Sequence, residues 1–125
     1  MGLPNAGDER GDSFNVPPEV FSFLGDVADI HLTTVVSGAI RGNHYHVRRR
    51  EVLIVKYEGD WQLHWDEGLG TPVQGKKTSG TGTALVFIEP GCSHALQNCG
   101  TALMTIFSLN SEAYDPAGTV RHKLI

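Results

Sequence analysis

Short strand-like segments separated by turn residues are the feature that most limits the folds open to this chain. Fifteen glycines and six prolines interrupt its 125 residues, so long amphipathic helices are hard to place. Between them lie short apolar segments, with turn signals about every ten positions. This pattern predicts an all-β domain, either a sandwich or a barrel.

Four apolar segments are the clearest predicted strands. They cover residues 29–38, 51–68, 83–91 and 102–110. The second segment contains a turn at Gly59-Asp60, which makes it a hairpin. In its second arm, Trp61, Leu63 and Trp65 alternate with polar residues. Such alternation is typical of a strand with one face against a core.

The rest of the chain carries weaker structural signals. Residues 17–26 could contain a helical turn, and residues 68–82 read as a polar loop with room for a short strand. Residues 110–125 are expected to form an irregular arm against the barrel. Neither a repeat nor a second domain is visible. We therefore expect one domain over residues 1–125, with an N-terminal arm at 1–28.

Composition and charge exclude several classes of function. The formal net charge is -4, which argues against general binding of nucleic acid. No run of about 18 apolar residues is present, so we expect no membrane span. The N-terminal stretch lacks the apolar core of a secretion signal. Cys92 and Cys99 are too few for a disulfide framework, so we expect free thiols in a cytoplasmic protein.

The stretch GNHYHVRRRE, residues 42–51, carries the most specific chemical signal. His44 and His46 are two residues apart, so on a strand their side chains project from one face. A hairpin partner would bring the Glu51 carboxylate beside them, and His94, after a Pro-Gly turn, is a candidate fourth ligand. Three imidazoles and one carboxylate suit a divalent ion, whether Zn, Fe, Mn or Ni. The alternative is that these are ordinary polar residues of a barrel.

The spacing of these residues resembles the two motifs of the cupin superfamily. The first motif is matched by Gly38, His44, His46, Glu51 and Gly59, and the second by Gly91, His94 and Asn98. Two departures affect turns: Gly59 comes one residue late, and the glycine that opens the second motif, Gly82, comes two residues early. The resemblance covers residues 38–98. It implies a cupin-type double-stranded β-helix, or jelly-roll barrel, in which His44, His46, Glu51 and His94 bind the metal.

A narrower resemblance concerns the sugar-nucleotide branch of the cupins. The sequence RGNHYH, with DERGDSF near the N-terminus and YDPAGTVR near the C-terminus, is similar to dTDP-4-dehydrorhamnose 3,5-epimerases and to cupin domains of capsular polysaccharide synthesis proteins. The resemblance implies that Arg41 contacts substrate and that His44 is the position of the epimerase base. Those epimerases have glutamine at the position of His46 and need no metal. A metal-bound His44 would be a poor free base.

These observations predict a metal-binding cupin that acts on a small molecule. The leading expectation is an isomerase or epimerase of carbohydrate or sugar-nucleotide metabolism, in which the ion stabilises developing negative charge. The alternatives are an Fe-dependent dioxygenase and a non-catalytic sugar-binding module. Arg41, Tyr57 and Trp65 are candidates for substrate binding, and no catalytic acid or base is assigned. The three arginines at positions 48–50 form either a solvated hairpin loop or an anion-binding group.

The strand EVLIVKY, residues 51–57, indicates a partner subunit. Leu53 and Val55 share one face of this strand, while Val52 and Ile54 point the opposite way. Apolar residues on both faces favour a strand covered on both sides. The outside of a barrel usually gains such cover from a second subunit, so we expect a homodimer.

Overall fold

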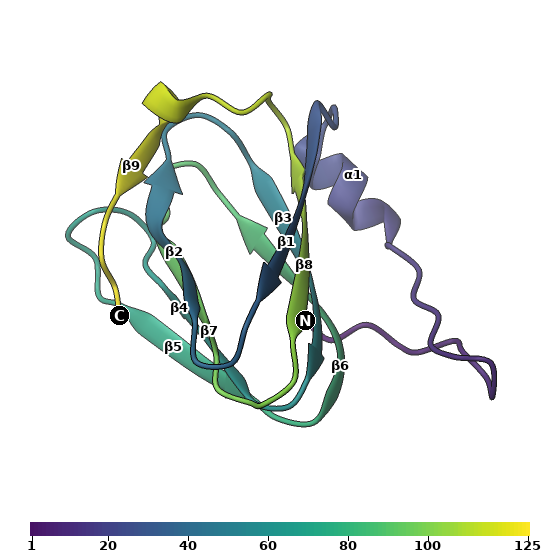
Figure 1. Cartoon of the computed structure of the whole chain (residues 1–125). Helices are drawn as coiled ribbons and strands as arrows, with labels where there is room; N and C mark the ends of the chain where they lie inside the picture. The colour runs from purple at the N-terminus through teal and green to yellow at the C-terminus, as the bar shows by residue number, and fades with distance from the viewer.

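Two antiparallel sheets face each other in the computed structural model, which describes residues 1–125 (Figure 1). The strands are β1 (Asp29–Val35), β2 (Ile40–His46), β3 (Glu51–Glu58), β4 (Trp61–Trp65), β5 (Gln74–Thr78), β6 (Thr81–Ile88), β7 (His94–Asn98), β8 (Met104–Asn110) and β9 (Thr119–Arg121). One sheet has the order β1-β8-β3-β6, and the other has the order β5-β4-β7-β2-β9. Strands distant in sequence are therefore neighbours, as in a jelly roll. The predicted all-β cupin-type barrel is confirmed.

The core lies between the two sheets and follows the predicted alternation along the strands. Leu53, Val55 and Tyr57 project inward from β3. They meet Trp61 of β4 and Leu96 of β7 from the opposite sheet. Because side chains alternate with a period of two, the intervening residues of β3 face the outside of the barrel.

The outer face of the four-stranded sheet is covered by the chain's own helix. Helix α1 (Pro18–Leu24) places Val20 and Leu24 against Val52 of β3, and all three are buried. The reason given for a partner subunit was therefore wrong in one respect, because Val52 is already covered within the chain. The helix forms where residues 17–26 allowed a helical turn. No helix in the structure is long and apolar enough to span a membrane.

The N-terminal residues close one edge of the same sheet. Gly2 forms a bridge with Ala84 of β6, and Leu3 N donates to Thr83 O at 2.8 Å. The chain then runs out beyond the barrel before it returns as α1 (Figure 1). The opposite edge of this sheet, strand β1, pairs only with β8. One edge is thus capped, and the other is open.

The C-terminal arm is more regular than expected. After a short 3-10 turn at Pro116–Gly118, β9 pairs with β2, which makes it the last strand of the five-stranded sheet. Strand pairing between segments so far apart in sequence leaves no local signal, since a three-residue strand has almost no periodicity. The expected polar loop at 68–82 likewise contains β5, which pairs with β4.

A bulge in β2 anchors this arm. Asn43 adopts a left-handed conformation with φ 58°, and the register with β7 shifts between Gly42 and His44. Asn43 Oδ1 accepts hydrogen bonds from Leu124 N at 2.8 Å and Ile125 N at 3.2 Å, and Asn43 Nδ2 donates to Ile125 O at 3.1 Å. The bulge therefore holds the end of the described chain against the strand that carries both histidines.

Candidate metal centre

The four predicted ligands lie together at one end of the barrel. His44 and His46 project from β2, Glu51 opens β3, and His94 opens β7. One imidazole nitrogen from each of the three histidines lies within 4.8 Å of those from the other two. Glu51 Oε1 lies 3.4 Å from His46 Nε2 and 3.3 Å from His94 Nε2. The structure therefore brings together side chains from three strands that sequence spacing had grouped.

The donor set fits a divalent ion. Two atoms bound to one ion at about 2.1 Å are about 3.0 Å apart in octahedral geometry and about 3.4 Å apart in tetrahedral geometry. The two contacts of Glu51 Oε1 fall in this range. The same oxygen is buried and has no hydrogen-bond partner. A buried carboxylate oxygen left in this way is costly, and a cation would compensate it.

The protonation states also suit metal binding. Burial, and then the neighbouring His94 and His46, lower the pKa of His44 to about 4, so its imidazole is neutral at pH 7. Burial alone would raise the pKa of Glu51. Its contacts with His46 and His94, with the hydrogen bond from Ser108, outweigh that effect and hold this pKa well below its ordinary range. The site therefore offers a carboxylate and a neutral imidazole without the release of a proton from either.

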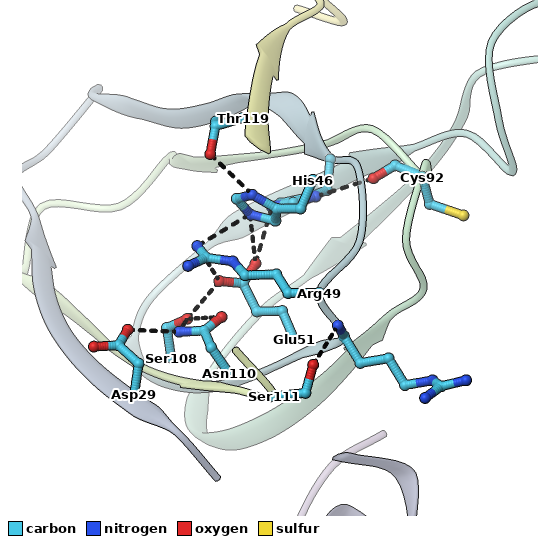
Figure 2. Close-up of polar contacts among 11 residues, drawn as sticks. Asp29, His46, Arg49, Glu51, Cys92, Ser108, Asn110, Ser111 and Thr119 are labelled. Carbon is cyan, nitrogen blue, oxygen red and sulfur yellow. Dashed lines mark hydrogen bonds and ion pairs between the residues drawn. The ribbon is translucent and has the colours of Figure 1, made fainter. Parts of the chain in front are cut away.

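A second layer of contacts orients the ligands, and Figure 2 shows most of it. His94 Nδ1 lies 3.3 Å from Cys92 O; since a carbonyl only accepts, Nδ1 would carry the proton when Nε2 binds an ion. His46 Nδ1 lies 3.2 Å from Thr119 Oγ1 of β9. Ser108 Oγ donates to Glu51 Oε2 at 2.5 Å. Thr119 and Ser108 come from strands β9 and β8, whereas Cys92 lies in the turn two residues before His94.

One transverse row of the five-stranded sheet crosses the site. Trp65 of β4 is the register partner of His94, His94 is the partner of His44, and His44 is the partner of Arg121 on β9. Register partners share a face of the sheet, so these four side chains project toward the same side. The row places an aromatic ring on one flank of the histidines and a guanidinium on the other.

A cavity lies at the Trp65–His94 end of this row. It has a volume of about 530 Å³, and Trp65, Leu63 and His94 are among its lining residues. That volume is typical of pockets for small molecules. Cys92 also lines it, and both cysteines are free, as expected. Burial raises the pKa of the Cys92 thiol, so it is protonated at neutral pH.

The predicted substrate-binding residues occupy different positions. Trp65 lies beside His94 in the row and on the cavity. Arg41 is the register partner of Leu96 and lies three residues before His44 on β2, and its Nη2 donates to Thr34 O at 3.3 Å. Tyr57 is instead a core residue at the far end of β3 from Glu51, which favours a structural role. Substrate contact by any of the three stays a prediction.

The arginine run separates into three environments. Arg48 is exposed, and Arg50 Nε lies 3.5 Å from Glu89 Oε2 at the surface. Arg49 turns inward, with Nη2 lying 3.7 Å from Glu51 Oε2. The three arginines therefore form neither a uniformly solvated hairpin loop nor a single anion-binding group. Sequence reasoning did not identify Arg49, Thr119 or Arg121 individually, because their positions depend on hairpin conformation and on the pairing of β9.

Comparison with known proteins agrees with this fold. Residues 7–119 match the family described as polysaccharide biosynthesis C-terminal domain. No curated protein sequence matches the chain. Among solved structures, the capsular polysaccharide assembling protein CapF from Staphylococcus aureus is similar with a TM-score of 0.69 and 22% identity, over 99% of this chain and 33% of CapF. This chain thus spans about a third of CapF.

Two shorter proteins are also similar in structure. NovW, a 4-keto-6-deoxy sugar epimerase from Streptomyces spheroides, has a TM-score of 0.74 and 20% identity, over 94% of this chain and 65% of NovW. A mutant form of the 3,4-ketoisomerase QdtA from Thermoanaerobacterium thermosaccharolyticum, in complex with TDP-4-keto-6-deoxyglucose, has a TM-score of 0.72 and 18% identity, over 98% of this chain and 85% of QdtA. These likenesses, at 18–22% identity, confirm the predicted cupin-type fold.

Proposed function

Because the chain belongs to the polysaccharide biosynthesis C-terminal domain family, we propose that it is a metal-binding cupin acting on a keto sugar nucleotide as an isomerase or epimerase. The observation that carries the proposal is the cluster of His44, His46, His94 and Glu51, all but His44 buried, in which His94 lines a cavity of about 530 Å³. NovW is a 4-keto-6-deoxy sugar epimerase, and QdtA has been crystallised with TDP-4-keto-6-deoxyglucose. Both descriptions name a 4-keto-6-deoxy sugar, which has a ketone group.

The four clustered side chains would hold the divalent ion. When bound, such an ion supplies Lewis-acid polarisation of a carbonyl oxygen, which acidifies the neighbouring C–H bond. Glu51 contributes the only negative charge among the ligands, and Ser108 keeps its second oxygen in place. Thr119 and the Cys92 carbonyl fix the imidazole planes of His46 and His94.

The two flanks of the transverse row suit the two ends of a sugar nucleotide. Trp65 offers an aromatic face to a sugar ring. Arg121 lies on the other flank, and Arg41 lies on β2 three residues before His44. Both are exposed, and neither forms an ion pair within the chain. Guanidinium groups bind phosphate oxygens through paired hydrogen bonds, so these two are proposed to bind the diphosphate.

Deuterium exchange tests the reaction directly. Metal-loaded protein is incubated with TDP-4-keto-6-deoxyglucose in D₂O, and the sugar is followed by NMR and mass spectrometry. We expect deuterium at the carbon next to the ketone, and no exchange above background with His94→Ala. Binding of the sugar nucleotide without exchange would instead support a non-catalytic module. Consumption of oxygen by the iron-loaded protein would support the dioxygenase alternative.

The metal requirement is tested separately, by elemental analysis of the purified protein and by exchange after chelation. About one ion per chain is expected for a single site of four ligands. Exchange that persists in protein stripped of metal would favour the metal-independent route. In that route the neutral His44 imidazole would itself accept the proton.

We also propose that the protein is a homodimer that pairs through β1. This strand is the open edge of the four-stranded sheet, and its outward residues Ile30 and Leu32 are 65% and 60% exposed. It carries no lysine or proline, the residues that usually protect an edge. Light scattering after size exclusion should give twice the 13.6 kDa chain mass for wild type. The Leu32→Lys variant should give the mass of a single chain. A wild-type monomer would contradict the proposal.

A further inference from the structure

Arg49 is turned into the barrel although it belongs to an exposed hairpin. Its side chain is 13% exposed, whereas that of Arg50 is 51% exposed. Its Nε is buried without a hydrogen-bond partner. The guanidinium carbon lies 5.9 Å from the centre of the Tyr114 ring, which covers it from the C-terminal arm. Burying a guanidinium is costly unless nearby groups compensate it, so its surroundings explain its position.

The groups that compensate Arg49 are those assigned to the metal. Arg49 Nη2 lies 3.4 Å from His46 Nε2 and 3.7 Å from Glu51 Oε2 (Figure 2). His46 Nδ1 is already in contact with Thr119 Oγ1, so Nε2 is the nitrogen that faces the site. One lone pair cannot serve both an arginine N–H and a metal ion. The arginine and the ion therefore compete for His46.

Charge adds a second form of competition. Without a metal ion, the +1 charge of Arg49 balances the −1 charge of Glu51, and the buried pair is neutral. A divalent ion held by Glu51 would lie close to the guanidinium in a region with little water to screen the repulsion. Arg48, one residue earlier, is exposed and carries the same charge. It provides a matched reference in which solvent screens the charge.

We propose that Arg49 is an internal cation that occupies the metal centre when no ion is bound and weakens the affinity of this centre for divalent metal ions. This inference rests on the proposed metal site. It assigns Arg49 a positioning role: the guanidinium keeps the Glu51–His46 pair assembled in the metal-free protein, and it gives up its contact with His46 Nε2 when the ion enters.

The test measures the affinity for Zn²⁺ of the full chain, by competition with a chromophoric chelator after removal of metal. Arg49→Met and Arg49→Gln should each raise the affinity by about tenfold or more, equivalent to about 1.4 kcal/mol. Arg49→Lys, which keeps the charge, should stay within about threefold of wild type, since lysine forms a less directed contact. Arg48→Met should change the affinity by less than about twofold, because an exposed charge is screened.

The outcomes separate this inference from the proposed function. Wild-type protein that binds Zn²⁺ with the same or higher affinity than folded Arg49→Met and Arg49→Gln would overturn the inference and leave the metal site standing. Binding by these variants but not by wild type would support it in its strongest form. If none of the proteins binds Zn²⁺, both the metal site and this inference fail. Circular dichroism establishes that each variant is folded. Two neutral variants are used so that the test still stands if one of them does not fold.

Discussion

Asn43 allows the link between the β2 bulge and the C-terminal arm to be measured. Its side chain forms three hydrogen bonds with the backbone of Leu124 and Ile125. A neutral hydrogen bond contributes about 0.5–1.5 kcal/mol net, and Asn43 is only half-buried, so Asn43→Gly should reduce the free energy of unfolding by about 2 kcal/mol. Glycine accepts the left-handed φ of 58°, so this variant removes the bonds without adding backbone strain.

Asn43→Ala adds the conformational term. A side chain with Cβ in the left-handed region costs about 1–2 kcal/mol, partly offset because glycine gains more entropy in the unfolded chain. The alanine variant should therefore be less stable than the glycine variant by about 0.5–1 kcal/mol.

Urea denaturation of the metal-free protein measures both differences, and for an m-value of about 2 kcal/mol/M the glycine variant should lose roughly 1 M in its midpoint. Hydrogen exchange over residues 119–125 should become faster in both variants. A glycine variant within about 0.5 kcal/mol of wild type would refute the argument, because three lost hydrogen bonds cannot be that small in sum.

Three further predictions concern the site. Between about pH 6.5 and 4, the His44 side chain binds a proton in the unfolded chain but not in the folded one, because folding lowers its pKa to about 4. The stability of the metal-free protein should therefore fall as the pH decreases through this window. Urea midpoints measured across the window should decline less steeply for His44→Gln than for wild type. Gly42→Ala would place a Cβ 2.5 Å from His94 O at φ +98°, so its melting temperature should fall by several degrees, whereas Gly38→Ala has open space and should be affected only by its φ of +80°. His94→Ala should abolish metal content in elemental analysis, while His64→Ala, outside the cluster, should retain it; equal metal in both would contradict the ligand assignment.

The clustering of the proposed ligands was predictable because a strand fixes the direction of its side chains. Two residues of separation place His44 and His46 on one face, and a tight hairpin can bring Glu51 beside them. The same local rule predicts the inward face of β3. These predictions need only the period of the strand and the position of turns, both of which are visible in the sequence.

The residues that escaped prediction depend on contacts between distant segments. Arg121 flanks His44 only because β9 pairs with β2, across more than seventy residues of sequence. Val52 is covered by α1, whose docking position has no sequence signature. Arg49 differs from its neighbours Arg48 and Arg50 in environment, not in residue type, because only its guanidinium contacts His46, Glu51 and the Tyr114 ring.

The pairing of β9 has a consequence for how the protein matures during synthesis. All four proposed ligands have left the ribosome once residue 94 has emerged, but Thr119, whose hydroxyl contacts His46 Nδ1, is made later. Closing the segment between β2 and β9 carries an entropic cost that contacts repay only after docking, so this strand joins late. Until then the nascent chain presents its histidines without their final orientation. The proposed metal capture in the mature geometry is therefore expected to follow the docking of β9.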